Sequence, residues 1–274
     1  MMIDAYVPSL LAELPRRAAQ AMPGQQLYLL IDGVFLPGFY RRVGAVVPHD
    51  ALALLFDVLP GSTDQVLAVS PFLVRYSADL PRLHVLLEQC SGWPMLSVIQ
   101  TTETLPQLKT RLAVWCVIQA DGQRFNFRFP DTRRLPGIFQ ALREEQRAQM
   151  AGPATRWSYV DRSGQWQELA VTGKALAAPG DKPELEMQQF GDMVGDSEPD
   201  EMLLRLSDRG RNWEFSLSQQ HAVVLQALAI ADSAGLETDL RLEWCEACLD
   251  DARQAAHPLS GERLARWRDA QVLT

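Results

Sequence analysis

Residues 27–33 read LYLLIDG, a run of apolar side chains that ends at an aspartate and a glycine. Such a run predicts a β-strand that is buried on both faces. Further strand candidates follow at residues 52–59, 71–76 and 95–100, and residues 80–90 place leucines at helical spacing between the last two. The alternation predicts an N-terminal lobe of the α/β (α+β) class, in which a mixed sheet is flanked by helices.

A β-hairpin is predicted downstream, where residues 112–119 and 123–129 flank Asp121 and Gly122. Asp-Gly favours the positive φ angles of a type I′ turn, which joins two paired strands. The second strand alternates so that three aromatic side chains share the face that we expect to pack on the core: Phe125, Phe127 and Phe129.

Three helices are predicted around these strands. Residues 9–21 have helical spacing, although Pro15 interrupts it. Residues 102–111 open with threonines and a proline, which are typical of a helix start. A longer helix, from about 134 to 150, is expected to be capped by Asp131 or Thr132 and to end before a Gly-Pro pair.

Glycine and proline punctuate residues 173–200, which read as a linker-like segment. It separates the N-terminal lobe, residues 1–172, from a smaller, mainly helical C-terminal lobe, residues 201–274. Helical patterns cover three segments of that lobe: residues 218–231, 238–254 and a short stretch from 260. In the first of them, Leu225 is predicted to be buried beside Val224.

The composition restricts the classes of partner. The chain has 274 residues, of which 47% are hydrophobic, and its formal net charge is −8. An acidic chain without a basic run is a poor candidate for binding nucleic acid or an anionic membrane. No apolar run approaches the roughly 20 residues of a membrane span, and the N-terminus lacks the pattern of a secretory signal. We therefore expect a cytoplasmic protein.

The positions of the cysteines and histidines in the sequence match no complete metal-binding or cofactor-binding motif, so we expect neither a metal ion nor a cofactor. Cys245 and Cys248 have the spacing of zinc or redox motifs, but no second ligand pair accompanies them and both fall within a predicted helix. We interpret them as core residues, like Cys90 and Cys116. The histidines are far apart in the sequence, and none has a neighbouring catalytic partner: His49, His84, His221 and His257.

Carboxylates at strand ends are the strongest enzymatic feature. Asp32 and Asp57 each follow an apolar strand candidate, and ligands often bind at the carboxyl ends of strands in α/β sheets. Two aspartates there could hold Mg²⁺ or act as an acid–base pair in a metal-dependent hydrolase. The competing interpretation, which we favour, is that both aspartates serve turns.

Residues 128–135, RFPDTRRL, place an arginine at a strand end and an aspartate at a helix start. Asp131 can accept backbone N–H bonds there and can pair with an arginine, which predicts a structural corner. The alternative is an anion site built from Arg128, Arg133 and Arg134. The negative charge of Asp131 would oppose such a site.

The order of these segments resembles a known family. In sequence come LYLLIDG (27–33), LFD (55–57), PFLVR (71–75), DGQRFNFRFPDTRRL (121–135) and a Gly-Pro pair (152–153) before Trp157. This order resembles the domain-of-unknown-function family 4123, the adaptor or chaperone proteins of bacterial type VI secretion effectors. The resemblance spans about residues 25–160. The chain departs from the family pattern at Pro130, in place of an aromatic residue, and at Thr132, in place of a proline.

The resemblance implies a non-enzymatic protein that binds a cognate toxic effector in the cytoplasm and loads it onto the VgrG spike. It also marks signature residues, to which we assign a structural role: Asp32, Phe56, Asp57, Arg128, Asp131 and Arg133. By analogy, the C-terminal lobe is expected to recognise the effector. Its large aromatic side chains are candidate partner contacts, because such residues are enriched at binding hot spots: Trp213, Phe215, Trp244 and Trp267. They could equally form the core of that lobe.

Overall fold

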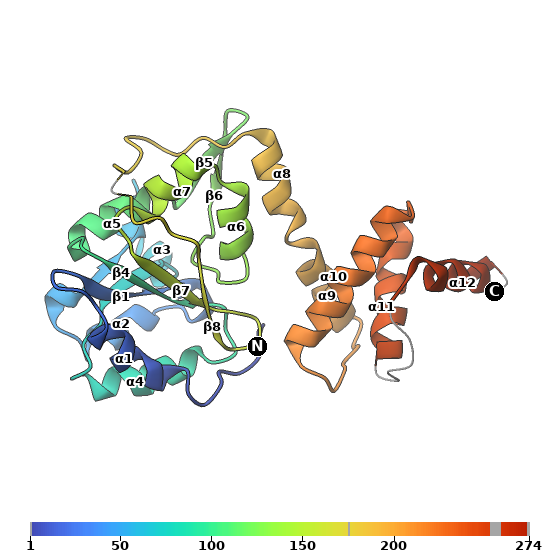
Figure 1. Ribbon diagram of the computed structural model, residues 1–274, viewed down its shortest axis with the longest axis horizontal. Coiled ribbons are helices and arrows are strands. Elements are labelled where there is room, and N and C mark those ends of the chain that lie inside the picture. The colour runs from blue at the N-terminus through green and yellow to red at the C-terminus, as the bar shows by residue number, and fades with distance from the viewer. Residues whose placement is uncertain (1, 175, 253–258, 273–274) are drawn as a thin grey trace. The chain divides into compact units, whose positions relative to one another are not determined.

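Six strands form one sheet among residues 2–174, 176–252 and 259–272, which are the residues described by the computed structural model (Figure 1). The strand order is β2-β3-β1-β4-β7-β8. The bounds are β1 Gln26–Ile31, β2 Leu52–Leu54, β3 Phe72–Arg75, β4 Leu96–Thr101, β7 Arg156–Val160 and β8 Trp166–Glu168. The predicted fold class is confirmed, with one difference in detail. The neighbouring strands in this order pair antiparallel, whereas a mixed sheet was expected.

Helices cover both faces of the sheet (Figure 1). Alternate side chains of β1 enter two separate cores: Tyr28 and Leu30 on one face, and Leu27, Leu29 and Ile31 on the other. The first core is covered by α5 Leu105–Val114, α6 Leu135–Ala141 and α7 Glu144–Ala151. The second is covered by α1 Leu14–Ala19, α2 Phe39–Gly44 and α4 Pro81–Leu87. Two-sided burial explains why β1 is apolar at consecutive positions.

The predicted hairpin is present but shorter than expected. It consists of β5 Val117–Ala120 and β6 Gln123–Asn126, joined by Asp121 and Gly122 with φ angles of 48° and 71°. Positive φ at both positions confirms the type I′ turn. Residues 112–114, predicted as strand, belong instead to the end of α5. The reason is that Leu105, Leu108 and Leu112 continue one helical stripe into the core.

Two further boundaries differ from the predictions. The strand expected over residues 52–59 ends at Leu54, because the Phe56 N–H donates to the hydroxyl of Ser70 and the chain turns into a short 3₁₀ helix, η4 Phe56–Val58. The helix expected from about 134 to 150 is two helices, because Arg143 and Gln146 form a capping box that starts α7 anew. Short elements complete the unit: η1 Leu11–Glu13, η2 Gly33–Phe35, η3 His49–Ala51, α3 Asp64–Ala68 and η5 Glu88–Cys90.

The chain divides into two compact units, Met1–Met193 and Val194–Thr274. The boundary falls inside α8 Met187–Gly195 and within the segment 173–200. Part of that segment is built onto the first unit. Leu185 is buried in its core, and the Gln189 side chain donates to the carbonyl oxygen of Ala141.

The second unit is helical, with a core of its own. It contains α9 Glu198–Asp208, α10 Leu217–Ser233, η6 Thr238–Leu240, α11 Arg241–Ala252 and α12 Gly261–Val272. Ser216 caps α10 through a capping box with Gln219, so the helix begins slightly earlier than the predicted start at residue 218. Leu225 is 52% exposed and not buried as predicted, because Val224 and Leu228 define the buried stripe of α10. His257 lies outside the described residues.

None of the helices in the described segments combines the length and the apolar character that a bilayer crossing requires.

Candidate functional site

Two aspartates are buried where β1 and the hairpin end. Asp32 follows β1, and its Oδ1 accepts the N–H of Val34 at 3.2 Å, which caps η2. Asp131 follows the hairpin, and the exposed fractions of the two residues are 3% and 2%. Gly33, next to Asp32, lies so close to Ser70 that an added Cβ would stand 2.3 Å from its carbonyl oxygen. Glycine is therefore required there, because a side chain would collide with the backbone of Ser70.

Two arginines neutralise these carboxylates. Arg133 binds Asp131 through two hydrogen bonds, Nε to Oδ1 at 3.1 Å and a terminal nitrogen to Oδ2 at 2.7 Å. Arg128 donates to Oδ2 of Asp32 at 2.9 Å and lies 3.7 Å from Oδ2 of Asp131. Charge-assisted bonds of this kind are stronger than neutral ones, and they fix the position of each side chain.

An aromatic ring completes the cluster. The guanidinium carbons of Arg128 and Arg133 lie 5.2 Å and 5.9 Å from the ring centre of Phe35, and this ring stacks on Trp93 at 5.9 Å. We call Asp32, Phe35, Arg128, Asp131 and Arg133 the charged corner. The Arg128 side chain is 47% exposed, so the corner presents one guanidinium group beside an aromatic ring at the surface.

The electrostatic balance of the charged corner depends on Arg128. Burial raises the pKa of Asp32 above its ordinary value, while the charge and hydrogen bond of Arg128 and the N–H of Val34 act in the opposite direction. Arg128 thus offsets part of the desolvation of the Asp32 carboxylate.

The charged corner differs from the prediction in the role of Asp131 as a helix cap. Asp131 does not cap α6, because that helix begins at Leu135 and its N-cap, Arg134, makes no side-chain cap bond. Asp131 accepts instead from the N–H of Arg133, two residues on. The predicted pairing of Asp131 with an arginine is present, and in the alternative anion site Arg128 and Arg133 would already be held by carboxylates.

The remaining signature residues lie elsewhere. Asp57 binds Lys109 of α5 at 2.6 Å, and Phe56 packs against the first core. Asp32 and Asp57, the pair considered for a hydrolase, are therefore engaged by different cations. Within the described parts of the chain, no three His, Cys, Asp or Glu side chains gather as a metal site would require.

The cysteines are buried thiols. All four are free, and burial raises the pKa of Cys245 and of Cys248 to about 12. A thiol with so high a pKa is a poor nucleophile at neutral pH, because the thiolate is the reactive form. Both belong to the core of the second unit, as predicted.

The aromatic side chains considered as partner contacts also contribute to that core. Trp244 is fully buried and donates from its indole nitrogen to the carbonyl oxygen of Ala227 at 2.9 Å. Its ring lies 5.5 Å from that of Trp267. Trp213, Phe215 and Trp267 are half-buried and pack against the same core. Trp244 is thus not at the surface, because its ring fills the centre of the unit.

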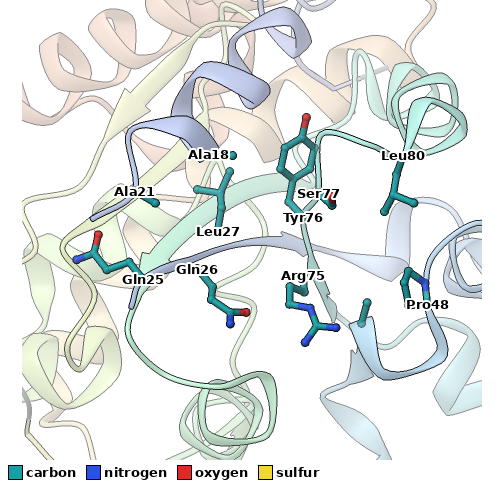
Figure 2. Close-up of a pocket in the computed structure, with 11 residues that line it drawn as sticks. Ala18, Ala21, Gln25, Gln26, Leu27, Pro48, Arg75, Tyr76, Ser77 and Leu80 are labelled. Carbon is teal, nitrogen blue, oxygen red and sulfur yellow. The ribbon is translucent and has the colours of Figure 1, made fainter. Parts of the chain in front are cut away.

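An open depression of about 430 Å³ lies at the other end of β1 (Figure 2). Gln25 and Gln26 line it from the start of β1, and Arg75 and Tyr76 from the end of β3. These polar groups are engaged with protein atoms: Arg75 binds Asp50 at 2.7 Å, and the Tyr76 hydroxyl lies 2.7 Å from Nε2 of His84. The depression holds no converging set of acid, base and nucleophile of the kind that catalysis needs.

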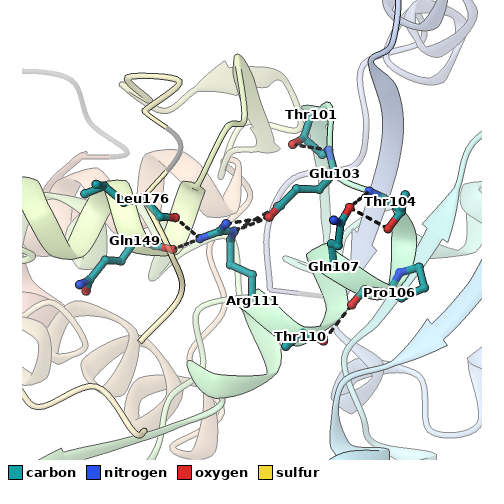
Figure 3. A network of polar contacts seen from close by, with 9 residues as sticks. All are labelled: Thr101, Glu103, Thr104, Pro106, Gln107, Thr110, Arg111, Gln149 and Leu176. Carbon is teal, nitrogen blue, oxygen red and sulfur yellow. Dashed lines mark hydrogen bonds and ion pairs between the residues drawn. The ribbon is translucent and has the colours of Figure 1, made fainter. Parts of the chain in front are cut away.

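A second buried ion pair was not predicted from the sequence. Arg111 of α5 binds Glu103 through Nε and a terminal nitrogen and donates to the carbonyl oxygens of Gln149 and Leu176, both at 2.8 Å (Figure 3). Phe35 was likewise missed. Neither residue lies in a recognisable motif, and their partners come together only through the path of the chain.

The segment that contains the charged corner matches a known protein family. The family model of the domain of unknown function DUF4123 matches residues 27–149. The chain carries a DUF4123 domain. This confirms the resemblance drawn from the order of strands and corner. Comparisons with curated proteins and with solved structures gave no match.

The DUF4123 match is shorter than the folded unit around it. It runs from β1 into α7 and contains the whole charged corner. Strands β7 and β8, which complete the sheet on one side of β4, and α1, which covers the second core, lie outside the matched segment. The DUF4123 segment therefore depends on flanking residues for a complete sheet.

Replacing Arg128 of the DUF4123 domain with methionine is expected to destabilise the protein by about 1–2 kcal/mol at pH 7, a value reduced because the side chain is half exposed. Without Arg128, the pKa of Asp32 rises further. A raised pKa in the folded state disfavours folding progressively as the pH rises above the ordinary aspartate pKa of the unfolded chain, and the penalty is complete above the raised pKa. The penalty disappears where Asp32 is protonated in both states. The loss should therefore be larger at pH 7 than at pH 4 in urea unfolding.

Arg124→Met is the matched control, because Arg124 lies in the same hairpin and is exposed. Its effect should be within about 0.5 kcal/mol at either pH. An Arg128→Met loss that is the same at pH 4 and pH 7 would mean that Arg128 does not support the Asp32 carboxylate.

Proposed function

We propose that this protein is an adaptor for a type VI secretion effector. In this role it binds a cognate toxic effector in the cytoplasm, keeps it soluble and delivers it to the VgrG spike. The observation that carries the proposal is the DUF4123 domain at residues 27–149, together with the resemblance of its strand order and corner to the effector adaptors. The C-terminal unit is proposed to recognise the effector.

The division of the chain supports an adaptor role. Two units with separate hydrophobic cores offer two surfaces, and an adaptor must contact both a cargo and its carrier. Binding through such surfaces, with interfaces of about 1,200–2,000 Å², permits release after delivery.

We also propose that the protein acts by binding and performs no reaction. The strongest enzymatic candidates, Asp32 and Asp57, are held in separate ion pairs with Arg128 and Lys109. Ion pairing of this kind is typical of carboxylates that stabilise a fold.

Co-expression with a toxin encoded beside a spike gene tests the adaptor role. The toxin alone is expected to be insoluble or unstable, and with this protein it should elute as one soluble complex in size-exclusion chromatography. The physical reason is that the adaptor covers an apolar patch that the toxin exposes when alone. The matched control is a toxin from an unrelated spike cluster, which should not join the complex.

Separate elution of the neighbouring toxin and this protein would contradict the proposal for that toxin. A rise in melting temperature with millimolar Mg²⁺ or Mn²⁺ would instead favour the hydrolase, since a ligand that binds only the folded state stabilises it.

A further inference from the structure

Helix α10 of the second unit contains a long stretch without charge. Residues 217–231, LSQQHAVVLQALAIA, include no Asp, Glu, Lys or Arg, although charged residues make up 22% of the chain. A helix with one face in water normally carries charged side chains on that face. A helix whose apolar residues extend to more than one side is typically covered on those sides.

Among the residues that the structure describes in the second unit, only one side of α10 is covered. Its buried residues face α9 and α11: Gln220, Val224, Ala227, Leu228 and Ala231. Four exposed residues recur one helical turn apart on another side: Ala222, Leu225, Gln226 and Ala229. We call these four residues the neutral face of α10. Its small alanines would let a second helix approach closely around Leu225.

The neutral face continues into a groove of about 550 Å³. Phe215, Val223 and Ala252 line the groove together with Ala222 of the neutral face. Glu214 and Gln219 supply its polar atoms. An apolar strip that ends in a groove is the geometry with which proteins receive an amphipathic helix.

The charge of the second unit indicates which helix it would receive. Residues 194–274 contain 15 acidic and eight basic residues, which gives a net charge of −7. Residues 1–193 contain 19 acidic and 18 basic residues, which gives a net charge of −1. Four of the arginines are engaged by acidic neighbours within the unit: Arg209 by Glu243, Arg211 by Asp250, Arg241 by Asp232 and Arg263 by Asp251.

Carboxylates also lie at both ends of the neutral face. Glu214 lines the groove at one end, and Asp232, 58% exposed in its side chain and paired with Arg241, lies at the other. An uncharged strip on a unit of net negative charge favours a partner with an apolar stripe and basic flanks, because opposite charges attract and like charges repel at such interfaces.

We propose that the neutral face of α10 binds a basic amphipathic helix. This inference rests on the proposed function, in which the helix belongs to the effector. The 17 residues of α10 span about 25 Å, so the bound helix would have about four to five turns.

The direct test uses two synthetic peptides of about 18 residues, each with leucines at helical spacing along one face. One carries lysine at its other positions, and the second carries glutamate. Fluorescence anisotropy with the full chain at about 150 mM salt should give a dissociation constant that is lower for the lysine peptide by about tenfold or more. Equal binding of the two peptides would overturn the proposed charge preference.

Leu225→Glu separates apolar docking from simple charge attraction. The substitution adds a negative charge, so a purely electrostatic contact would bind the lysine peptide as well or better. Docking on the neutral face predicts the opposite, a weakening by about tenfold or more, because the charge would be buried against leucine. Ala229→Glu, one turn further on, should act in the same direction. Glutamate favours helices, so α10 should persist in both variants, which circular dichroism and hydrogen exchange would check.

Val85→Glu is the matched control, because Val85 is an apolar helical residue with 61% exposure in the first unit. It should change peptide binding by no more than about twofold. Unchanged or tighter binding by both Leu225→Glu and Ala229→Glu would overturn the proposal. So would a dimer that Leu225→Glu converts to monomer, since the occupant would then be a second copy of this chain.

Co-expression separates this inference from the adaptor role. A toxin complex that forms with the unaltered protein and is lost with Leu225→Glu supports both. A complex that survives both α10 substitutions leaves the adaptor role intact and overturns the inference. If no toxin complex forms but Leu225→Glu still weakens the lysine peptide, the binding face stands and the adaptor role fails for that toxin.

Discussion

Replacing Arg111 with methionine is expected to lower the free energy of unfolding by about 3–5 kcal/mol, the range seen when one partner of a buried ion pair is removed. The Arg111 and Glu103 side chains are only 9% and 12% exposed, so methionine would leave the Glu103 carboxylate buried without its cation. The carbonyl oxygens of Gln149 and Leu176 would lose a charged donor as well (Figure 3). Because Leu176 belongs to the segment after the last strand, that segment should lose protection in hydrogen exchange.

Lys109→Met is the matched control for Arg111. Lys109 lies two positions earlier on α5 and pairs with Asp57 nearer to solvent, so its removal should change stability by about 0–1 kcal/mol. Removing both partners, in Arg111→Met with Glu103→Met, should be less harmful than Arg111→Met alone, because no charge is then left buried. Equal effects of Arg111→Met and Lys109→Met in urea unfolding would refute the central role of this network.

Trp244→Ala is expected to destabilise the second unit by about 3–5 kcal/mol, as large-to-small core substitutions do. The residue is fully buried, its indole contacts Trp267, and it donates to the carbonyl oxygen of Ala227 on α10. A unit of this size has little stability to spare. Amides of α9, α10 and α11 should therefore lose protection in hydrogen exchange, whereas β1 and β4 should keep theirs, because their cores share no described residue with that of the second unit.

Trp213→Ala is the control in the same unit. Trp213 is half-buried at the edge of the core and donates to Asp250, so its truncation should destabilise by about 1–2 kcal/mol. A Trp244→Ala protein that remains fully protected but no longer binds the effector would contradict the assignment of Trp244 to the core and restore it as a contact residue.

Much of the fold could be predicted because local patterns act over short distances. The apolar run at residues 27–31 predicted β1, and Asp121-Gly122 predicted the type I′ turn. The predictions were wrong where two patterns overlapped. Residues 112–114 suit a strand by composition. They belong to α5 because Leu105, Leu108 and Leu112 form one helical stripe that packs into the core.

The charged corner could be predicted only in part. The pairing of Asp131 with Arg133 lies within two positions, so the spacing itself brings the groups together. Asp32 and Arg128 are 96 positions apart, and no local sequence pattern near either residue indicates that they pair. The same holds for Arg111, whose contacts with Gln149 and Leu176 span 38 and 65 positions.

The sequence by itself determined β1 to β4 in outline, which turn joins the hairpin and which family the order of these segments resembles, but it did not indicate β7 or β8. The tertiary structure alone decided that the main sheet is antiparallel and which cation pairs with each buried carboxylate. It also decided that Leu225 is exposed while Trp244 is buried. The physical reason is range. Backbone propensity and side-chain periodicity act between residues a few positions apart, whereas strand direction and charge pairing follow from the path by which distant segments meet.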